Sequence, residues 1–353
     1  MAAGAYLQQL GAFVLLVGVQ TFAILLFKLC QVNGAYTFSP ASSVALTEMC
    51  KLVLAMFLHM QFRDKSKPLF ENVNTRMVLH YLGLSALYTA NNQLSFYVLE
   101  VADPGTMSLG KSIAPYLCAL LLRLTGQLLH ELQWVCVIIQ CCAIAIVQYD
   151  NCSGSGILSL YAYGLIATAT SITAITSVWN QLVIKGFDVP MNLQNAILYG
   201  FGSAIAVSAY VWEAHHATHA RRVPPFFHGY NALAALLVLF QAFHGLAVAL
   251  VYKYADAIVK NFANSSVMAL LIVISFYFFK LQTSVHSWLG IVIVLTTTYC
   301  YMNIALKLPT GGAAAPPGAA AKVAVVEGRA AESEGAKLLE EGEGEPVGRS
   351  PGK

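Results

Sequence analysis

Residues 230–253 read YNALAALLVLFQAFHGLAVALVYK, an apolar stretch that decides the fold class of this chain. A helix needs about 20 consecutive, mainly apolar residues to cross the hydrocarbon core of a bilayer, because each residue adds about 1.5 Å. Cutting the rest of the chain at polar or turn-forming clusters gives further stretches of the same kind. The ten expected spans are residues 5–30, 41–62, 76–99, 105–123, 133–149, 157–184, 192–213, 230–253, 257–279 and 286–306.

The composition agrees with a membrane protein. Of the 353 residues, 58% are apolar and 10% are charged, whereas about a quarter of the residues in soluble domains are charged. The 20 basic and 17 acidic residues are too few to cover a soluble surface of this size. A soluble enzyme is therefore excluded, and the chain is expected to lie in a lipid bilayer. The net charge of +3 is weak and scattered, so no nucleic-acid partner is expected.

The composition changes at Pro309, where Ala, Gly, Pro, Glu and Lys replace the apolar runs. Such a segment cannot bury enough apolar surface to fold. The sequence therefore predicts one membrane domain over residues 1–308 and a disordered cytosolic tail over residues 309–353.

Lysine and arginine residues in the short connections indicate the orientation, because cytosolic loops carry an excess of them. With a cytosolic N-terminus, more of these residues fall on the cytosolic side, and an even number of spans places both termini there. Asn151, Cys152 and Ser153 then form a lumenal triplet of the glycosylation type, whose occupancy stays open.

Two short matches indicate an internal duplication. Val101–Asp103 precedes the fourth span and Tyr254–Asp256 precedes the ninth, 153 residues later. Trp134 and Trp288, 154 residues apart, open the fifth and tenth spans. The prediction is an all-α fold of two five-helix repeats, residues 1–153 and 154–308. Because five is odd, the second repeat is inverted, and inverted repeats place a substrate site near the bilayer midplane.

Lysines inside the expected spans are candidates for the site, since buried charges face a cavity or a partner. Lys111 and Lys260 would approach one cavity from opposite sides, which suits a ligand that carries phosphate. For Lys260 the alternatives are a pair with Asp256 or snorkelling to the interface. For Lys111 the alternative is a pair with Asp103. Both carboxylates are thus candidates for structural ion pairs.

Glu48 and Lys51, one helical turn apart, are expected to form a further structural ion pair. The adjacent Asn91 and Asn92 could read a base or sugar edge, or could join helices.

In the seventh span, Asn195 and Tyr199 lie four residues apart on one helical face. Tyr199 could stack a nucleobase that Asn195 hydrogen-bonds. It could equally be an aromatic residue of the membrane interface. His244 could line a cavity, although a packing histidine is the favoured interpretation.

No metal or other cofactor is expected. The eight cysteines lack paired ligand spacing and are interpreted as core-filling thiols. His215, His216 and His219 have spacing compatible with a metal but lie in an exposed hairpin. No catalytic constellation is found, so a transporter is favoured over the alternatives of an intramembrane enzyme, a proton-coupled small-metabolite carrier or an ion channel.

Several segments in order resemble one family of transporters. They are Thr47–Lys51, Asn91–Asn92, Gln133–Trp134, Ser177–Lys185, Asn192–Gly200 and Tyr252–Lys260. This pattern is similar to nucleotide-sugar transporters of the CMP-sialic acid and UDP-galactose type, in the drug/metabolite transporter superfamily, and most of all to their plant and algal branch. The resemblance covers residues 40–306.

The resemblance implies a Golgi or endoplasmic reticulum antiporter with ten helices. It would exchange a cytosolic nucleotide sugar for a lumenal nucleoside monophosphate. Whether the protein forms a homodimer stays open. Asn91, Asn195, Tyr199 and Lys260 match the family's site. The chain departs from the family at Lys111, where the lysine stands two positions early, and at Ala90, where the family commonly has Gln. The sugar and the pyrimidine base therefore stay open.

Overall fold

The computed structural model describes residues 2–32, 35–102, 107, 110–149, 159–216, 224–280 and 283–307. These residues lie in the first of the chain's two units, which ends at Gly311. The expected tail, Asp103 and the triplet at Asn151 fall outside the described residues. The elements are α1 (Ala2–Leu29), β1 (Gln31–Val32), β2 (Ala35–Tyr36), α2 (Pro40–Phe62), α3 (Thr75–Val101), α5 (Ala114–Leu124), α6 (Glu131–Tyr149), α7 (Leu160–Gly186), α8 (Met191–His216), α9 (Ala232–Tyr254), α10 (Ala257–Phe279) and α11 (Val285–Lys307).

The prediction of an all-α fold is confirmed. Within the described ranges there are ten helices. The only strands in those ranges are β1 and β2, which have two residues each and pair antiparallel, with Gln31 opposite Tyr36. Short polar side chains begin several helices by accepting a backbone N–H of the first turn. Ser39 accepts from Ser42, Asn74 from Met77, and Asn231 from Ala234. The apolar runs between such caps are the helices themselves.

Seven of the described helices are long and apolar enough to cross a membrane: α1, α2, α7, α8, α9, α10 and α11. Helix α3 has sufficient length, with 27 residues, but carries polar residues such as Asn91 and Asn92. Helices α5 and α6 are apolar but shorter.

The expected fourth span, residues 105–123, is not one continuous helix. Gly110 and Lys111 are helical, Ser112 and Ile113 form a turn, and α5 begins at Ala114. Pro115 lies in the first turn of α5, where its missing N–H costs nothing. The prediction of an unbroken span was wrong because apolarity does not reveal such a break.

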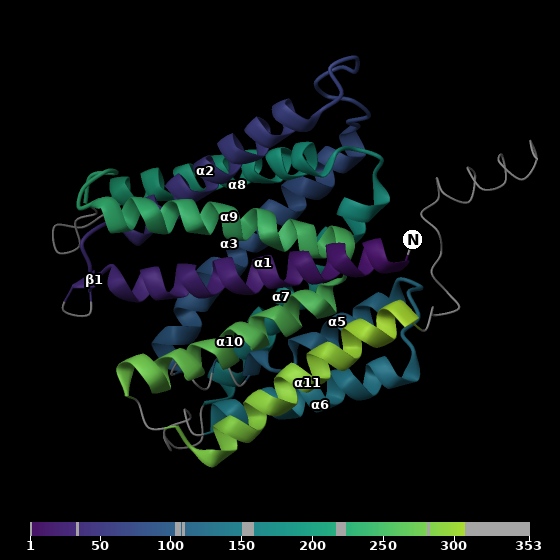
Figure 1. The fold of residues 1–353 in the computed structure, drawn as a ribbon. Helices are drawn as coiled ribbons and strands as arrows, with labels where there is room; N and C mark the ends of the chain where they lie inside the picture. The colour runs from purple at the N-terminus through teal and green to yellow at the C-terminus, as the bar shows by residue number, and fades with distance from the viewer. Residues whose placement is uncertain are drawn as a thin grey trace, which may run out of the picture. The chain divides into compact units, whose positions relative to one another are not determined.

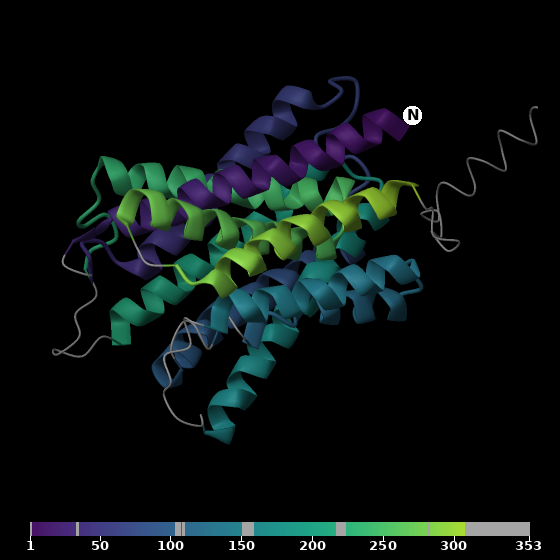
Figure 2. The same ribbon diagram turned by 60° about the horizontal axis from the view of Figure 1, so that its bottom comes forward.

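The helices pack as pairs that are distant in sequence (Figure 1). The most extensive pairs are α2 with α8, α1 with α9, and α6 with α11. Helix α3 packs on α7 and α8, α5 on α7, and α1 on α10. The first residues of α1 and the last of α11 lie at the same end of the helices, opposite the hairpin, in both views (Figures 1 and 2). The chain therefore makes an even number of passes between its two described ends.

The described residues form five buried hydrophobic clusters, of which two are the largest. The larger cluster includes Leu16 of α1, Tyr252 of α9 and Phe262 of α10. The second joins α2, α3, α7, α8 and α9 and includes Tyr81 and Tyr199. Large apolar side chains such as Phe57 and Phe278 remain exposed at 60% and 80%. A lipid environment is the setting in which such an apolar surface is stable.

Candidate functional site

Helices α2, α8 and α9 meet around a lysine. Lys51 Nζ forms an ion pair with Glu48 Oε1 at 2.7 Å, one turn away on α2. The same ammonium group lies 5.6 Å from the centre of the Tyr199 ring of α8, which is within the range of a cation–π contact. Lys51 thus neutralises a carboxylate and covers an aromatic ring at once. A nucleobase could stack on that face of Tyr199 only after Lys51 had moved.

Two glycines allow this close approach. A Cβ atom at Gly245 of α9 would lie 3.0 Å from both Lys51 Cε and Tyr199 Oη. A Cβ atom at Gly202 of α8 would lie 2.8 Å from Glu48 Oε2. The bare backbone at both positions leaves room for the ion pair between the helices.

His244 of α9 lies within electrostatic range of both Lys51 and Lys260. Lys111 and Lys260 likewise lie close enough for their charges to repel. Lys260 and Lys111 are only partly buried, and neither forms an ion pair with another described residue. The structure therefore brings together basic groups from three helices and from the segment before α5.

Lys260 occupies the first turn of α10, where the helix dipole presents its positive end. A cation is unfavourable at this end of a helix, so its position does not serve helix stability. Asp256 does not pair with it. Asp256 Oδ1 instead accepts the Val259 N–H at 2.7 Å, and its Oδ2 accepts the Tyr301 hydroxyl at 3.1 Å. The carboxylate that the sequence offered as a partner is used as a helix cap.

Helix α7 also holds the start of α10. Gln181 Oε1 accepts the backbone N–H of Ala257 at 2.6 Å. Lys185 donates a hydrogen bond to the carbonyl of Ala255. On the far side, Asn261 Nδ2 lies 3.2 Å from Cys118 Sγ of α5. The first turn of α10, and with it Lys260, is thus fixed from α5, α7 and α11.

A chain of hydroxyl and amide groups crosses from α3 to α9. Asn180 Nδ2 of α7 donates to Tyr88 Oη of α3 at 3.2 Å. The hydroxyl groups of Tyr252 of α9 and Ser177 of α7 lie next to this pair, with Tyr252 close to Tyr88. Buried polar groups need such partners.

Asn195 lacks partners of this kind. Asn195 is only 1% exposed, and neither its Nδ2 nor its Oδ1 atom has a hydrogen-bond partner in the described part of the chain. An unpaired buried carboxamide costs about 1–3 kcal/mol per lost bond. A ligand that pairs with both atoms would remove this cost.

The two neighbouring asparagines of α3 diverge. Asn91 Nδ2 donates to Thr173 Oγ1 of α7 at 3.2 Å, whereas the Asn92 side chain is exposed. Adjacent helical residues point in directions about 100° apart, so the two carboxamides do not share a face. Asn91, three positions after Tyr88, lies on the inner side of α3.

Sequence reasoning treated Lys51 as a structural residue only, because Glu48 already explained its charge. It missed Tyr88, Asn180 and Tyr252, whose side chains read as ordinary residues of apolar helices. The signal for Lys51 was a cation 11 residues inside its helix, far from either end. Tyr252 begins a segment that resembles the family, but nothing in the sequence assigned a contact to it or singled out Tyr88.

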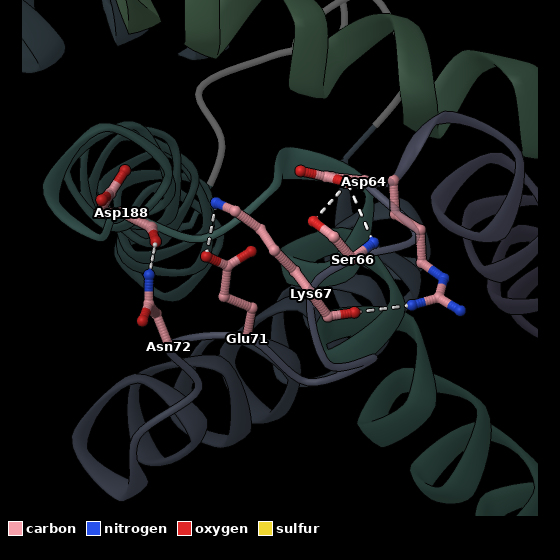
Figure 3. A network of polar contacts seen from close by, with 7 residues as sticks. Asp64, Ser66, Lys67, Glu71, Asn72 and Asp188 are labelled. Atoms are coloured by element: carbon pink, nitrogen blue, oxygen red, sulfur yellow. Dashed lines mark hydrogen bonds and ion pairs between the residues drawn. The ribbon is translucent and has the colours of Figure 1, made fainter.

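The loop between α2 and α3 carries a separate polar network (Figure 3). Asp64 Oδ1 accepts both the N–H and the hydroxyl of Ser66, which lowers the pKa of Asp64. Lys67 Nζ lies 2.7 Å from Glu71 Oε1, and this pairing raises the pKa of Lys67. These charged groups are solvent-accessible and order the loop.

The same loop contacts the connection between α7 and α8. Asn72 Nδ2 donates to the carbonyl of Asp188 at 3.1 Å, as Figure 3 shows. A cleft of about 370 Å³ lies here, lined by residues that include Lys67, Asp188 and Lys253. Its two lysines and two carboxylates give it no net preference for an anion, in contrast to the lysines around His244.

Within the described ranges, no group of three His, Cys, Asp or Glu side chains is arranged to hold a metal ion. His215 and His216 lie at the exposed end of α8, and the third member, His219, falls outside those ranges.

The comparisons with known proteins agree with this chemistry. The sequence profile described as "Nucleotide-sugar transporter" matches residues 6–302. The rice (Oryza sativa subsp. japonica) protein named CMP-sialic acid transporter 1 is 27% identical over 81% of this chain and 92% of its own length. The bovine (Bos taurus) protein named UDP-galactose translocator is 29% identical over 80% of this chain and 74% of its own length.

A solved crystal structure has the same fold, with a TM-score of 0.62 over 87% of this chain and 99% of that chain. At 15% identity this likeness concerns the fold alone. The match of the family profile to nearly the whole helical part carries the assignment. This chain belongs to the nucleotide-sugar transporter family, whose members are membrane transporters and not enzymes.

Proposed function

We propose that this protein is an antiporter that exchanges a cytosolic pyrimidine nucleotide sugar for a lumenal nucleoside monophosphate across the Golgi membrane. The observation that carries the proposal is the gathering of Lys51, Lys111 and Lys260 inside a helical membrane protein. Lys111 and Lys260 have no carboxylate partner among the described residues. Cations inside a membrane bundle that lack such a partner suit a mobile anion, and phosphate is the anion that nucleotide sugars and nucleoside monophosphates share.

The remaining site residues fit the other parts of such a ligand. Asn195, with both carboxamide atoms unpaired and buried, would hydrogen-bond the base or ribose. Asn91 would do so from α3, and Tyr199 would bound the base. Asn92 is kept as a candidate only for a state in which α3 has turned, since it is exposed here. The relatives named for CMP-sialic acid and UDP-galactose support a pyrimidine base.

Inverted repeats would supply the mechanism, and the helix pairs support them. Exchanging α1, α2, α3, α5 and α6 with α7, α8, α9, α10 and α11, respectively, turns the pair α1–α9 into α7–α3 and the pair α1–α10 into α7–α5. The same exchange turns α2–α9 into α8–α3, and it leaves α2–α8 and α6–α11 unchanged. All of these pairs pack in the structure. In alternating access, one repeat rocks against the other around a central substrate site. A two-fold relation between two halves of five helices fits this motion.

Exchange follows if the empty carrier changes slowly between its cytosol-facing and lumen-facing states. A bound nucleotide must then lower the energy barrier of that change. A proton-coupled carrier fits less well, because Glu48 is paired with Lys51 and Asp256 caps α10. Neither carboxylate is free to carry a proton through the membrane.

Counterflow tests the proposal. Proteoliposomes that contain the purified protein would be preloaded with UMP, CMP or GMP, and uptake of labelled CMP- and UDP-sugars would be measured. We expect uptake to be stimulated by CMP or UMP on the inside. Absence of stimulation by all three nucleotides would exclude the antiporter.

A further inference from the structure

His244 is an ionisable side chain near the middle of a membrane helix. It lies 10 residues before the last residue of α9, so roughly 15 Å of helix separates it from that end. The residue is only partly buried, and its ring nitrogens form no hydrogen bond within the described part of the chain. A polar group at such depth normally faces a partner or a cavity. Among the described residues, no protein group satisfies this imidazole.

The surroundings of His244 are positively charged. Lys51 approaches from α2 and Lys260 from α10, and both charges act on the imidazole. The next residue, Gly245, brings the α9 backbone close to Lys51, whose Cε lies 3.0 Å from an added Cβ. His244 is therefore within electrostatic range of Lys51, which is paired with Glu48, and of Lys260, which has no carboxylate partner among the described residues.

An imidazole offers something that the lysines do not. In either charge state the ring has at least one N–H donor, held in a fixed direction by a short side chain. A lysine ammonium is a flexible point charge that attracts phosphate without orienting it. A directed donor near two such charges would fix which phosphoryl oxygen faces α9, and hence the direction in which the rest of the ligand extends.

We propose that His244 is a specificity-determining residue that donates a hydrogen bond to a phosphoryl oxygen of the ligand held between Lys51 and Lys260. The inference rests on the proposed function, since it assigns a further contact within the same site. It predicts that His244 distinguishes ligands with phosphate from ligands without it.

Binding to the purified full-length protein tests the inference, with UMP, CMP, uridine, cytidine and inorganic phosphate as probes. His244→Phe keeps a ring and removes the donor, whereas His244→Gln offers an amide N–H at similar reach. His286→Gln is the control, because His286 is exposed at the start of α11. Thermal unfolding of each variant without ligand establishes that it is folded.

We expect His244→Phe to bind UMP and CMP about tenfold more weakly, as for loss of a hydrogen bond to a charged group. Uridine and cytidine should bind as before, and His244→Gln should recover part of the loss. If nucleosides and nucleotides weaken alike, His244 is a packing residue and the inference is wrong. Unchanged nucleotide affinity in both folded variants would overturn it as well.

Inorganic phosphate separates this inference from the proposed function. In one outcome, phosphate stabilises the wild-type protein but not His244→Phe, while no nucleotide binds to either. That result would support the contact of His244 with phosphate and exclude the nucleotide-sugar function. If nucleotides bind and His244→Phe makes no difference, the function stands and the inference falls. If no probe that contains phosphate binds to the wild-type protein, both are excluded.

Discussion

Gln181 of α7 accepts the backbone N–H of Ala257 at 2.6 Å and thereby joins the middle of the bundle to the first turn of α10. The residue is fully buried, and its Nε2 donates to Gln127 Oε1 at 3.2 Å. One amide side chain therefore connects the end of α5 with the helix that carries Lys260.

Replacing Gln181 by Leu should destabilise the protein, because the Ala257 N–H would be buried without an acceptor. We expect a loss of about 1–3 kcal/mol, seen as a lower unfolding temperature in detergent. Thr168→Val is the matched control on α7, since Thr168 is exposed and bonds only within its own helix. An equal decrease in unfolding temperature in both variants would show that the hydrogen bond to Ala257 does not contribute specifically to stability.

Charge removal at Lys260 should weaken binding of nucleoside monophosphates at least tenfold, because a charge-assisted hydrogen bond contributes about 1.5–3 kcal/mol. Lys260→Gln should leave the affinity for uncharged nucleosides nearly unchanged. Lys111→Gln should behave in the same way if both lysines face one ligand. Lys28→Gln, at an exposed position at the end of α1, is the control.

The double variant Lys260→Gln with Asp256→Asn separates a ligand contact from an internal pair. Asp256 caps α10 and does not bond to Lys260, so Asp256→Asn should not restore nucleotide binding. Restored affinity in the double variant would instead assign Lys260 to Asp256.

Two glycine substitutions test the packing of α6 on α11. A Cβ atom at Gly290 would lie 2.4 Å from Val147 Cγ2 and 3.2 Å from the Ala143 carbonyl, so Gly290→Ala should cost about 1–3 kcal/mol. At Gly200 nothing lies within 4 Å, and Gly200→Ala should be neutral or stabilising, since alanine favours helix. Thermal unfolding of both variants measures the difference, and equal values would contradict the close approach of α6 to α11 at Gly290.

The contact between Asn72 and Asp188 should hold the α2–α3 loop. Asn72 has a φ of 57°, a left-handed conformation that Asn and Gly adopt more readily than Ala. Asn72→Gly removes only the hydrogen bond, whereas Asn72→Ala also strains the backbone. Hydrogen exchange of residues 63–74 should therefore rise in both variants and rise more in Asn72→Ala.

The two ends of the helical unit lie on one side, which predicts that tags at both termini share one compartment. With the excess of Lys and Arg in the connections on that side, we expect both tags to be accessible from the cytosol in intact organelles. Protection of both tags from a cytosolic protease would reverse the orientation, and protection of one would contradict the even number of passes.

The sequence by itself determined where most of the long helices lie. Apolar runs of about 20 residues predict the long helices, because spanning a bilayer sets their length, and the structure shows that local caps such as Ser39 and Asn74 begin them. The Glu48–Lys51 pair follows from the same local geometry. Nothing in that geometry revealed the interruption at Ser112 and Ile113 before α5.

Contacts between distant residues were decided only by the tertiary structure. That Lys51 covers Tyr199 depends on α2 packing against α8, and that His244 comes near both Lys51 and Lys260 depends on α9 meeting α2 and α10. Asp256 could have paired with Lys260 by spacing alone, but the Val259 N–H and the Tyr301 hydroxyl engage it instead. A sequence shows which charges a membrane helix contains, whereas helix rotation and packing decide which charges face each other.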